Sequence, residues 1–408
     1  MEKDLIDWKT NAWQDPRMAA WYQQRMLENR GTNRLKNQVE VALCARHVVG
    51  NQLLDVGVGS GRASLPLARA GFAVTGVDSS QAMLDQTRAQ AGETPIRLLQ
   101  RDLADLKFAD GEFDTVMSLN VLVHFPHWRE ILAEWQRVLR PNGRIVFDIH
   151  SQDHEDAACA ARGLPARPQD EGNFADYHSR IRVADLVEAA TGLDLALVAV
   201  IPYNSGNSNT WLAGTLADGA RFNRLLSWLV SDTRLYDFAL FIEQEIFAPL
   251  TSRVTGRFMV VLDKRPDPQG NQAWLERDTA LNRLLDGPLD CAALATLAPS
   301  FDADWRQRLN AHLDWPRNRV LLYNLLSAWE AFPAHLDLAS FLEPRHAEAL
   351  QNWREQAAID AATTRTLRDL AALPGLNGWL RHQEVPLAGG LEYDLTRAML
   401  TRYFHVFD

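Results

Sequence analysis

The chain has 408 residues, 47% of them hydrophobic and 23% charged, and its formal net charge is −10. This length suits two or three domains with full apolar cores. The acidic balance argues against nonspecific nucleic-acid binding, because no basic surplus exists to neutralise phosphates. The three cysteines lie far apart and predict neither a disulfide framework nor a zinc site: Cys44, Cys159 and Cys291.

The N-terminal stretch carries charges but no apolar core of the kind that a signal peptide needs. No apolar run in the chain approaches the length of a membrane span. We therefore expect a cytoplasmic protein without a membrane partner. Residues 1–37 are expected to form a helical cap rich in aromatic side chains: Trp8, Trp13, Trp21 and Tyr22.

The most distinctive motif is the run LLDVGVGSGR at residues 53–62. An apolar strand ends at Asp55, and a helix-like run follows at residues 63–70. Between them stand three glycines, which let the backbone turn sharply and approach a ligand: Gly57, Gly59 and Gly61. The next helix presents free N–H groups to an anion. By itself such a loop is a weak signal, and its spacing G-x-G-x-G differs from the dinucleotide fingerprint G-x-G-x-x-G.

Further short strands alternate with helical runs after this loop. Polar residues follow them: Asp78 after 73–77, Asp102 after 96–99, Asn120 and His124 after 113–118, and His150 after 144–149. A turn is expected at residues 141–143, before the last of these strands. Because open α/β sheets bind ligands at the carboxyl ends of their strands, we expect these residues to face one pocket. Taken singly, an aspartate at a strand end is also an ordinary turn residue.

Four motifs in this order resemble those of class I S-adenosylmethionine-dependent methyltransferases: LLDVGVGSGR, VTGVDSS, RDLADLKFADGEFDTVMSLNVLVHF and EWQRVLRPNGRIVFDIH. The resemblance covers residues 51–149 and continues more weakly to 265. It implies an α/β fold with a Rossmann-like, seven-stranded, doubly wound sheet. It also implies a methyltransferase, with S-adenosylmethionine as its cofactor.

The resemblance further implies roles for single residues. The loop from Gly57 to Gly61, after Asp55, would hold the methionine part of the cofactor. Asp78 would bind the ribose hydroxyls. Three residues would complete the site, at the adenine amino group, beside the adenine ring and near the methionine end: Asp102, Leu103 and Asn120, respectively.

The aromatic cap offers two interpretations. A sulfonium cation can lie against an aromatic face, so Trp21 or Tyr22 could contact the cofactor. Alternatively, these side chains pack the helix on the sheet edge.

The chain divides into three expected parts: the cap 1–37, a methyltransferase domain 38–265 and a helical domain 271–408. Strands at 193–201 and 257–262 would form the antiparallel edge of the sheet, and the insertion 205–255 between them is expected to be a lid or interface. A Pro/Gly-rich break at 266–270 is the candidate linker. The all-α C-terminal part resembles no family that we recognise. It could serve as a homodimer contact, as a docking module for a protein partner or as a cap that shapes the substrate site.

Methyl transfer to a hydroxyl needs a positioned acceptor and removal of its proton, which histidine can accept near neutral pH. The candidate catalytic residues all follow strand ends: His124, His150 and Tyr203. Each has a plainer alternative, since His124 and His150 could only line the pocket and Tyr203 could be a wall residue. A group at 148–156 contains metal-ligand types, but it lacks the separated ligand pairs of a closed site, so no metal is expected: Asp148, His150, Asp153, His154 and Asp156.

These features predict an S-adenosylmethionine-dependent methyltransferase that acts on a small-molecule acceptor, with O-methylation favoured over N- or C-methylation. One alternative is a non-catalytic cofactor-binding subunit whose helical C-terminal domain mediates protein interaction. A weaker alternative is a nicotinamide-dependent enzyme, which the early third glycine and the Asp102-Leu103 pair disfavour.

Overall fold

A computed structural model describes most of the chain, in the ranges 2–27, 32–161, 163–172, 177–203, 232–247, 252–253, 256–287, 290–297, 301–319, 322 and 337–355. The chain forms two compact units. The first comprises Met1–Asn29, Asn33–Ser205 and Ile246–Arg283, and the second comprises Arg30–Thr32, Gly206–Glu245 and Leu284–Asp408. The three-part division expected from the sequence stays a prediction.

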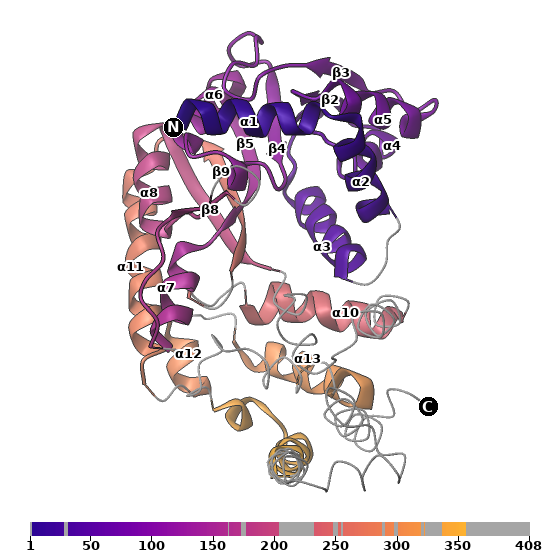
Figure 1. The fold of residues 1–408 in the computed structure, drawn as a ribbon. Coiled ribbons are helices and arrows are strands. Elements are labelled where there is room, and N and C mark those ends of the chain that lie inside the picture. The colour runs from indigo at the N-terminus through magenta and orange to yellow at the C-terminus, as the bar shows by residue number, and fades with distance from the viewer. Residues whose placement is uncertain are drawn as a thin grey trace, which may run out of the picture. The chain divides into compact units, whose positions relative to one another are not determined.

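The first unit is built on a seven-stranded sheet with the order β3-β2-β1-β4-β5-β9-β8 (Figure 1). Its strands are β1 Gln52–Val56, β2 Ala73–Asp78, β3 Arg97–Gln100, β4 Phe113–Ser118, β5 Leu139–His150, β8 Leu195–Pro202 and β9 Arg257–Lys264. Strands β1 to β5 are parallel. This arrangement confirms the predicted doubly wound α/β sheet.

The last two strands of the sheet form its far edge and pair antiparallel, as expected. Strand β9 lies between β5 and β8 and runs antiparallel to both, so that β8 at the edge points the same way as β5. The carboxyl end of β8 and the start of β9 therefore lie at the same end of the sheet as the carboxyl ends of β1 to β5.

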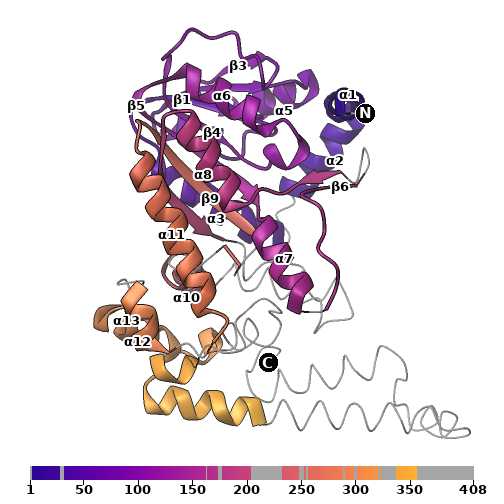
Figure 2. The ribbon, with the colours of Figure 1, turned by 90° about the vertical axis from the view of Figure 1, so that its left-hand side faces the viewer.

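The hydrophobic pattern explains how helices cover the sheet. The central strands β1, β2 and β4 are buried along most of their length, as is typical when helices cover both faces. Helix α6, Trp128–Val138, has an apolar face with helical spacing, and α8, Val183–Gly192, buries Leu186 and Ala190 in the same core. Figure 2 looks onto the side of the sheet covered by α8 and by α11, Pro268–Leu284.

The N-terminal cap consists of two helices, α1 Glu2–Gln14 and α2 Pro16–Leu27. Proline at the first helical position is favourable because its missing N–H needs no partner there. Asp15 precedes it, and its carboxylate accepts a hydrogen bond from the Arg17 N–H at 2.8 Å. Both helices lie against α5, Gln81–Ala91, beside β2 (Figure 1). Two further helices, α3 Thr32–His47 and α4 Ser64–Arg69, flank β1 in the chain.

Two local features differ from the sequence-based expectation. The turn expected at residues 141–143 is part of β5, where Asn142 has φ 61° and the pairing with β4 shifts register. The linker expected at 266–270 contains the start of α11. Asn271 fixes this helix on β8, because its Oδ1 accepts from the Leu197 N–H at 2.7 Å and its Nδ2 donates to the Leu195 carbonyl at 2.8 Å.

The described part of the second unit is helical, as expected for the C-terminal region. It contains α10 Thr233–Phe241, the first part of a π-helical turn Ile242–Phe247, α12 Cys291–Leu297, α13 Ala303–Leu313 and a 3-10 turn Leu338–Phe341. Aromatic rings form part of its core, where Trp305 lies 4.3 Å from Phe301 and 5.6 Å from Phe341 between ring centres. The helices expected at 222–230, 364–372 and 395–407, and most of the one at 319–332, lie outside the described residues. None of the described helices is long and apolar enough to cross a membrane.

Candidate functional site

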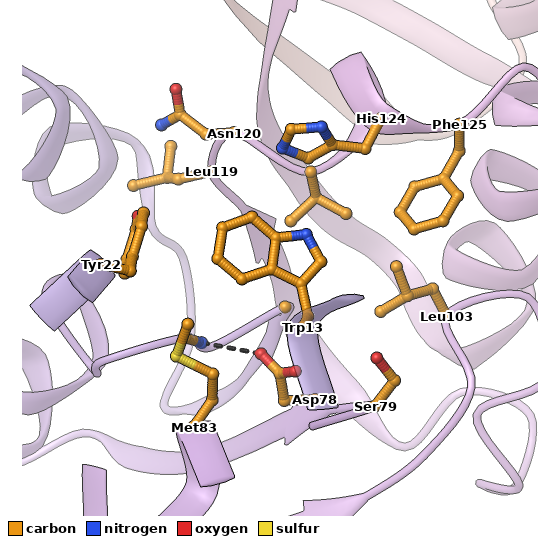
Figure 3. Close-up of a pocket in the computed structure, with 13 residues that line it drawn as sticks. Trp13, Tyr22, Asp78, Ser79, Met83, Leu103, Leu119, Asn120, His124 and Phe125 are labelled. Atoms are coloured by element: carbon orange, nitrogen blue, oxygen red, sulfur yellow. Dashed lines mark hydrogen bonds between the residues drawn. The ribbon is translucent and has the colours of Figure 1, made fainter. Parts of the chain in front are cut away.

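A pocket of about 640 Å³, its open mouth included, lies at the carboxyl ends of β1, β2 and β4 (Figure 3). Seven of the residues predicted from the sequence line it: Tyr22, Gly57, Gly59, Asp78, Leu103, Asn120 and His124. Six further residues complete the lining: Trp13, Ser79, Met83, Leu119, Val121 and Phe125.

The glycine loop forms one wall of the pocket. The N–H groups of Gly57 and Val58 donate to the Val77 carbonyl at 2.8 and 2.9 Å, which ties the loop to β2. Gly57 has φ 76°, and a Cβ added there would stand 2.4 Å from a methyl of Val121. At Gly59 a Cβ would meet nothing closer than 3.9 Å, so the loop is open toward the pocket at this residue.

Gly61 lies outside the pocket lining and has a different task. Its φ is 73°, and an added Cβ would stand 2.8 Å from the Thr87 methyl and 2.9 Å from Leu65. The third glycine therefore permits close packing between the start of α4 and helix α5.

Asp78, at the end of β2, is the carboxylate of the pocket. One of its oxygens accepts from the Gly59 N–H at 2.9 Å, shown as the dashed line in Figure 3, and the other accepts from the Ser80 N–H at 2.9 Å. Burial raises the pKa of Asp78, and these N–H donors partly offset that effect. Each carboxylate oxygen has a further lone pair, so the ionised group can still accept hydrogen bonds from hydroxyls of a ligand.

Two other predicted carboxylates lie outside the lining. Asp55 is buried beneath the glycine loop and accepts a hydrogen bond from the Ser64 hydroxyl at 2.5 Å. Asp102 accepts from the Ala104 N–H at 2.8 Å, while the neighbouring Leu103 does line the pocket. Their predicted roles toward a cofactor stay predictions.

The aromatic cap contributes two rings to the pocket. Tyr22 of α2 lines it as predicted, and Trp13 of α1 lines it although neither motif nor spacing singles it out. Figure 3 shows the Trp13 indole between Tyr22 and His124, with ring centres 5.5 and 6.0 Å away. Trp21 lies in α2, but its side chain is outside the described residues. The break at Asp15 explains why Trp13 and Tyr22 approach the pocket from two separate helices.

The three predicted catalytic residues lie in different places. His124 ends the 3-10 turn η1, Leu122–His124, and lines the pocket. His150 ends β5 and pairs with Arg257 of β9, outside the lining. Tyr203 is fully buried, and its hydroxyl lies 2.9 Å from Glu40 Oε1 and 3.2 Å from Asp148 Oδ2.

A buried ion cluster, defined here as Glu40, Arg62, Asp148 and Arg257, surrounds the Asn120 wall of the pocket. Arg62 forms an ion pair with Glu40, and Arg257 Nη1 lies 3.7 Å from Asp148 Oδ2. Burial opposes the charge of Arg62, but Glu40 raises the pKa of this guanidinium overall. The only signal for Glu40 in the sequence is its place inside the apolar run at 39–44.

The possible metal ligands of residues 148–156 point to separate partners. Asp153 accepts from the Val183 N–H at 2.9 Å, Asp156 accepts from Gln152 Nε2 at 2.7 Å, and His154 Nδ1 lies 3.2 Å from the Arg253 carbonyl. Within the described ranges, no group of three or more His, Cys, Asp or Glu side chains could hold a metal ion.

Comparisons with known proteins give a consistent result. Residues 54–147 match the family model described as "Methyltransferase domain". The chain is 30% identical over 174 residues to a ubiquinone biosynthesis O-methyltransferase of Alkalilimnicola ehrlichii, covering 41% of this chain and 70% of that protein. It is 34% identical over 167 residues to a phosphatidylethanolamine N-methyltransferase of Cereibacter sphaeroides, covering 40% of this chain and 79% of that protein.

Two further similarities are shorter or more distant. The putative methyltransferase YqeM of Bacillus subtilis is 38% identical over 105 residues, which span 24% of this chain and 42% of that protein. Among solved structures, the magnesium protoporphyrin IX methyltransferase of Synechocystis with bound SAH is 21% identical, with a TM-score of 0.32. That alignment covers 41% of this chain and 75% of the other.

The chain belongs to the class I S-adenosylmethionine-dependent methyltransferases, and its cofactor is S-adenosylmethionine. The pocket suits this cofactor chemically. It offers an open glycine loop at Gly59, a buried carboxylate at Asp78 for hydroxyls, and apolar side chains such as Leu103 for a flat base. Aromatic rings, such as that of Tyr22, can contact a sulfonium cation.

Proposed function

We propose that this pocket holds S-adenosylmethionine and that the enzyme methylates a hydroxyl oxygen of a small-molecule acceptor. Asp78 would bind the ribose hydroxyls, Leu103 would lie beside the adenine, and the Gly57–Gly59 loop with Asn120 would hold the methionine end. When bound, the cofactor supplies an electrophilic methyl group on a sulfonium. The protein must then align the acceptor oxygen and take up its proton.

The observation that carries the choice of oxygen is the position of His124. This residue lines the same pocket as Asn120, and its backbone N–H donates to the Val121 carbonyl at 2.9 Å within the turn η1. The turn therefore fixes the backbone position from which the imidazole side chain extends. An imidazole can accept a proton from a hydroxyl acceptor near neutral pH. A fraction of an amine acceptor is already unprotonated when it binds, so an amine has less need of this base.

The relatives support a small-molecule acceptor but name two kinds of atom. One relative is named for O-methylation in ubiquinone biosynthesis and another for N-methylation of phosphatidylethanolamine. We choose oxygen because of His124. The expected cytoplasmic location and the expected homodimer or protein partner of the C-terminal region stay predictions.

A matched pair of variants tests this proposal. Phenolic and amine acceptors would be incubated with labelled S-adenosylmethionine, and methyl transfer would be measured for wild type, His124→Gln and His127→Gln. His127 follows closely in the same segment but lies outside the pocket lining. We expect transfer to a phenolic oxygen, with kcat lowered about 10²- to 10⁴-fold in His124→Gln and nearly unchanged in His127→Gln. Transfer to amines alone, or equal rates in both variants, would contradict the proposal.

A further inference from the structure

Asn120 is held from three sides by polar contacts. Its side-chain amide nitrogen donates to the two Glu40 oxygens at 3.3 and 3.2 Å, and its side-chain oxygen accepts from Arg257 Nη1 at 2.9 Å. Its backbone N–H donates to Asp148 Oδ1. Both ends of the side-chain amide and the main chain are therefore fixed by residues that are distant in sequence.

The backbone of Asn120 explains why such fixing is needed. Its φ is 59°, in the left-handed region, which asparagine adopts more often than other side-chain-bearing residues but still far less readily than glycine. Strained conformations of this kind persist where the surroundings determine them and often mark ligand sites. Asn120 also lines the cofactor pocket, so its position sets the shape of one wall.

The partners of Asn120 are unusual because they are charged and buried. Glu40 is fully buried and Asp148 is 3% exposed, and Arg257 keeps only 24% of its side-chain exposure. Taking charges out of water is costly, and apolar side chains of the same volume are often at least as stable. Stability alone therefore does not account for a buried ion cluster at this place.

Tyr203 connects the two acidic members of the cluster. It extends from the end of β8 and places one hydroxyl within hydrogen-bond distance of both Glu40 and Asp148. Burial, and then the charges of these two carboxylates, raise the pKa of Tyr203 well above its ordinary value. The phenol thus keeps its proton near neutral pH and donates it to the cluster, which does not fit the role of a general base.

We propose that Tyr203, with Glu40 and Asp148, is a positioning residue that holds Asn120 in its left-handed conformation and thereby sets the affinity for the cofactor. The proposal rests on the proposed cofactor role of the pocket. It replaces the catalytic role that the sequence predicts for Tyr203 with an action through Asn120.

Removal of a single hydroxyl tests the proposal with little change in shape. Calorimetric titration with S-adenosylmethionine would compare wild type, Tyr203→Phe and the matched control Tyr177→Phe. Tyr177 is also buried and donates to a carboxylate, Asp170, at 2.7 Å, but it lies outside the cluster. We expect at least a fivefold loss of affinity in Tyr203→Phe and less than twofold in Tyr177→Phe. Thermal unfolding of each variant would show that both fold.

A double-mutant cycle shows whether Tyr203 acts through Asn120. Glycine adopts a positive φ freely. Asn120→Gly therefore still allows the left-handed backbone conformation but removes the side chain that the cluster holds. In the Asn120→Gly background we expect Tyr203→Phe to change the affinity less than twofold. An unchanged affinity in the single Tyr203→Phe variant, or a full loss in both backgrounds, would overturn the proposal. Absence of binding by the wild type would instead contradict the cofactor pocket itself.

Discussion

Asn120 stands between two regions of opposite character. On one side is the cofactor pocket, whose wall combines apolar side chains such as Leu103 with backbone groups of the glycine loop. On the other side is the buried ion cluster, whose polar atoms bond to one another and to Asn120. In the pocket, Asp78 above all can still accept hydrogen bonds from a ligand. In the cluster, the polar atoms use their hydrogen bonds on one another and on Asn120. The first region is suited to bind and the second to hold the first in place.

The largest effect should come from breaking the cluster. In Glu40→Gln the guanidinium of Arg62 loses its charged partner while it stays buried. Loss of one partner of a buried ion pair costs about 3–5 kcal/mol of unfolding free energy. Denaturant unfolding measures this loss, with Glu112→Gln as the control. Glu112 pairs with Arg97 at the surface, and we expect a change of about 1 kcal/mol or less there.

The double variant Glu40→Gln with Arg62→Met sharpens this prediction. It removes both charges together and keeps an amide oxygen that can accept from Tyr203 or Asn120, so it should be more stable than Glu40→Gln alone. Equal destabilisation in the single and the double variant would mean that apolar volume, rather than charge pairing, dominates at this position.

A second effect should be confined to the pocket. Asp78→Ala removes the carboxylate expected to bind the ribose and also the partner of the Gly59 and Ser80 N–H groups. Hydrogen bonds to charged groups contribute about 1.5–3 kcal/mol each, so we expect affinity for S-adenosylmethionine to fall about 100-fold or more. Asp85→Ala is the control, because Asp85 is exposed on α5 and bonds only to Gln81 and Arg88 among the described residues. If Asp78→Ala and Asp85→Ala bind S-adenosylmethionine with the same affinity, then Asp78 does not belong to the cofactor site.

The smallest effect concerns Asp55, beneath the glycine loop. Burial raises its pKa to about 6 from 3.8, although the Ser64 hydrogen bond and Arg62 oppose the shift. The folded protein thus binds this proton more tightly than the unfolded chain. The resulting stabilisation is complete below about pH 4 and is lost as the pH rises through about 6. Asn does not titrate at this position. As the pH rises from 4 to 7, we therefore expect the unfolding free energy of Asp55→Asn to increase relative to that of wild type by on the order of 2 kcal/mol.

Asp114→Asn provides a control of opposite sign. Burial opposes ionisation of Asp114, but the N–H groups of Gln52 and Asn51 and the side chain of Arg140 lower its pKa overall. Its stabilising contribution is therefore present above the unfolded pKa and is lost as the pH falls through the lower, folded value. Unfolding curves over pH 3–7 measure both variants. The same pH trend in both would contradict the environment assigned to Asp55.

The two regions also differ in how far the sequence predicts them. Gly57, Gly59 and Asp78 belong to short motifs at strand ends, and the chemistry of a parallel sheet places such residues together. The sequence does not predict that Trp13 lines the pocket, because the break at Asp15 separates it from the helix that carries Tyr22. Only the packing of α1 against α5 places Trp13 at the pocket.

The buried ion cluster can be predicted only when the order of the strands in the sheet is known. Glu40 and Arg257 are charged residues on a helix and at a strand start, which from the sequence alone are expected at the surface. Arg257 lies beside Asp148 because β9 inserts between β5 and β8, and both Arg257 and Glu40 bond to the side chain of Asn120. The histidines show the limit of the strand-end rule, since His124 lines the pocket and His150 does not.

A crystal structure of the full chain with S-adenosylhomocysteine tests the central claim most directly. We expect both ribose hydroxyls within hydrogen-bond distance of Asp78, the adenine against Leu103, and the amino-acid end beside Asn120, whose φ stays positive. A ligand bound elsewhere, or a ribose turned away from Asp78, would contradict the assignment of this pocket as the cofactor site.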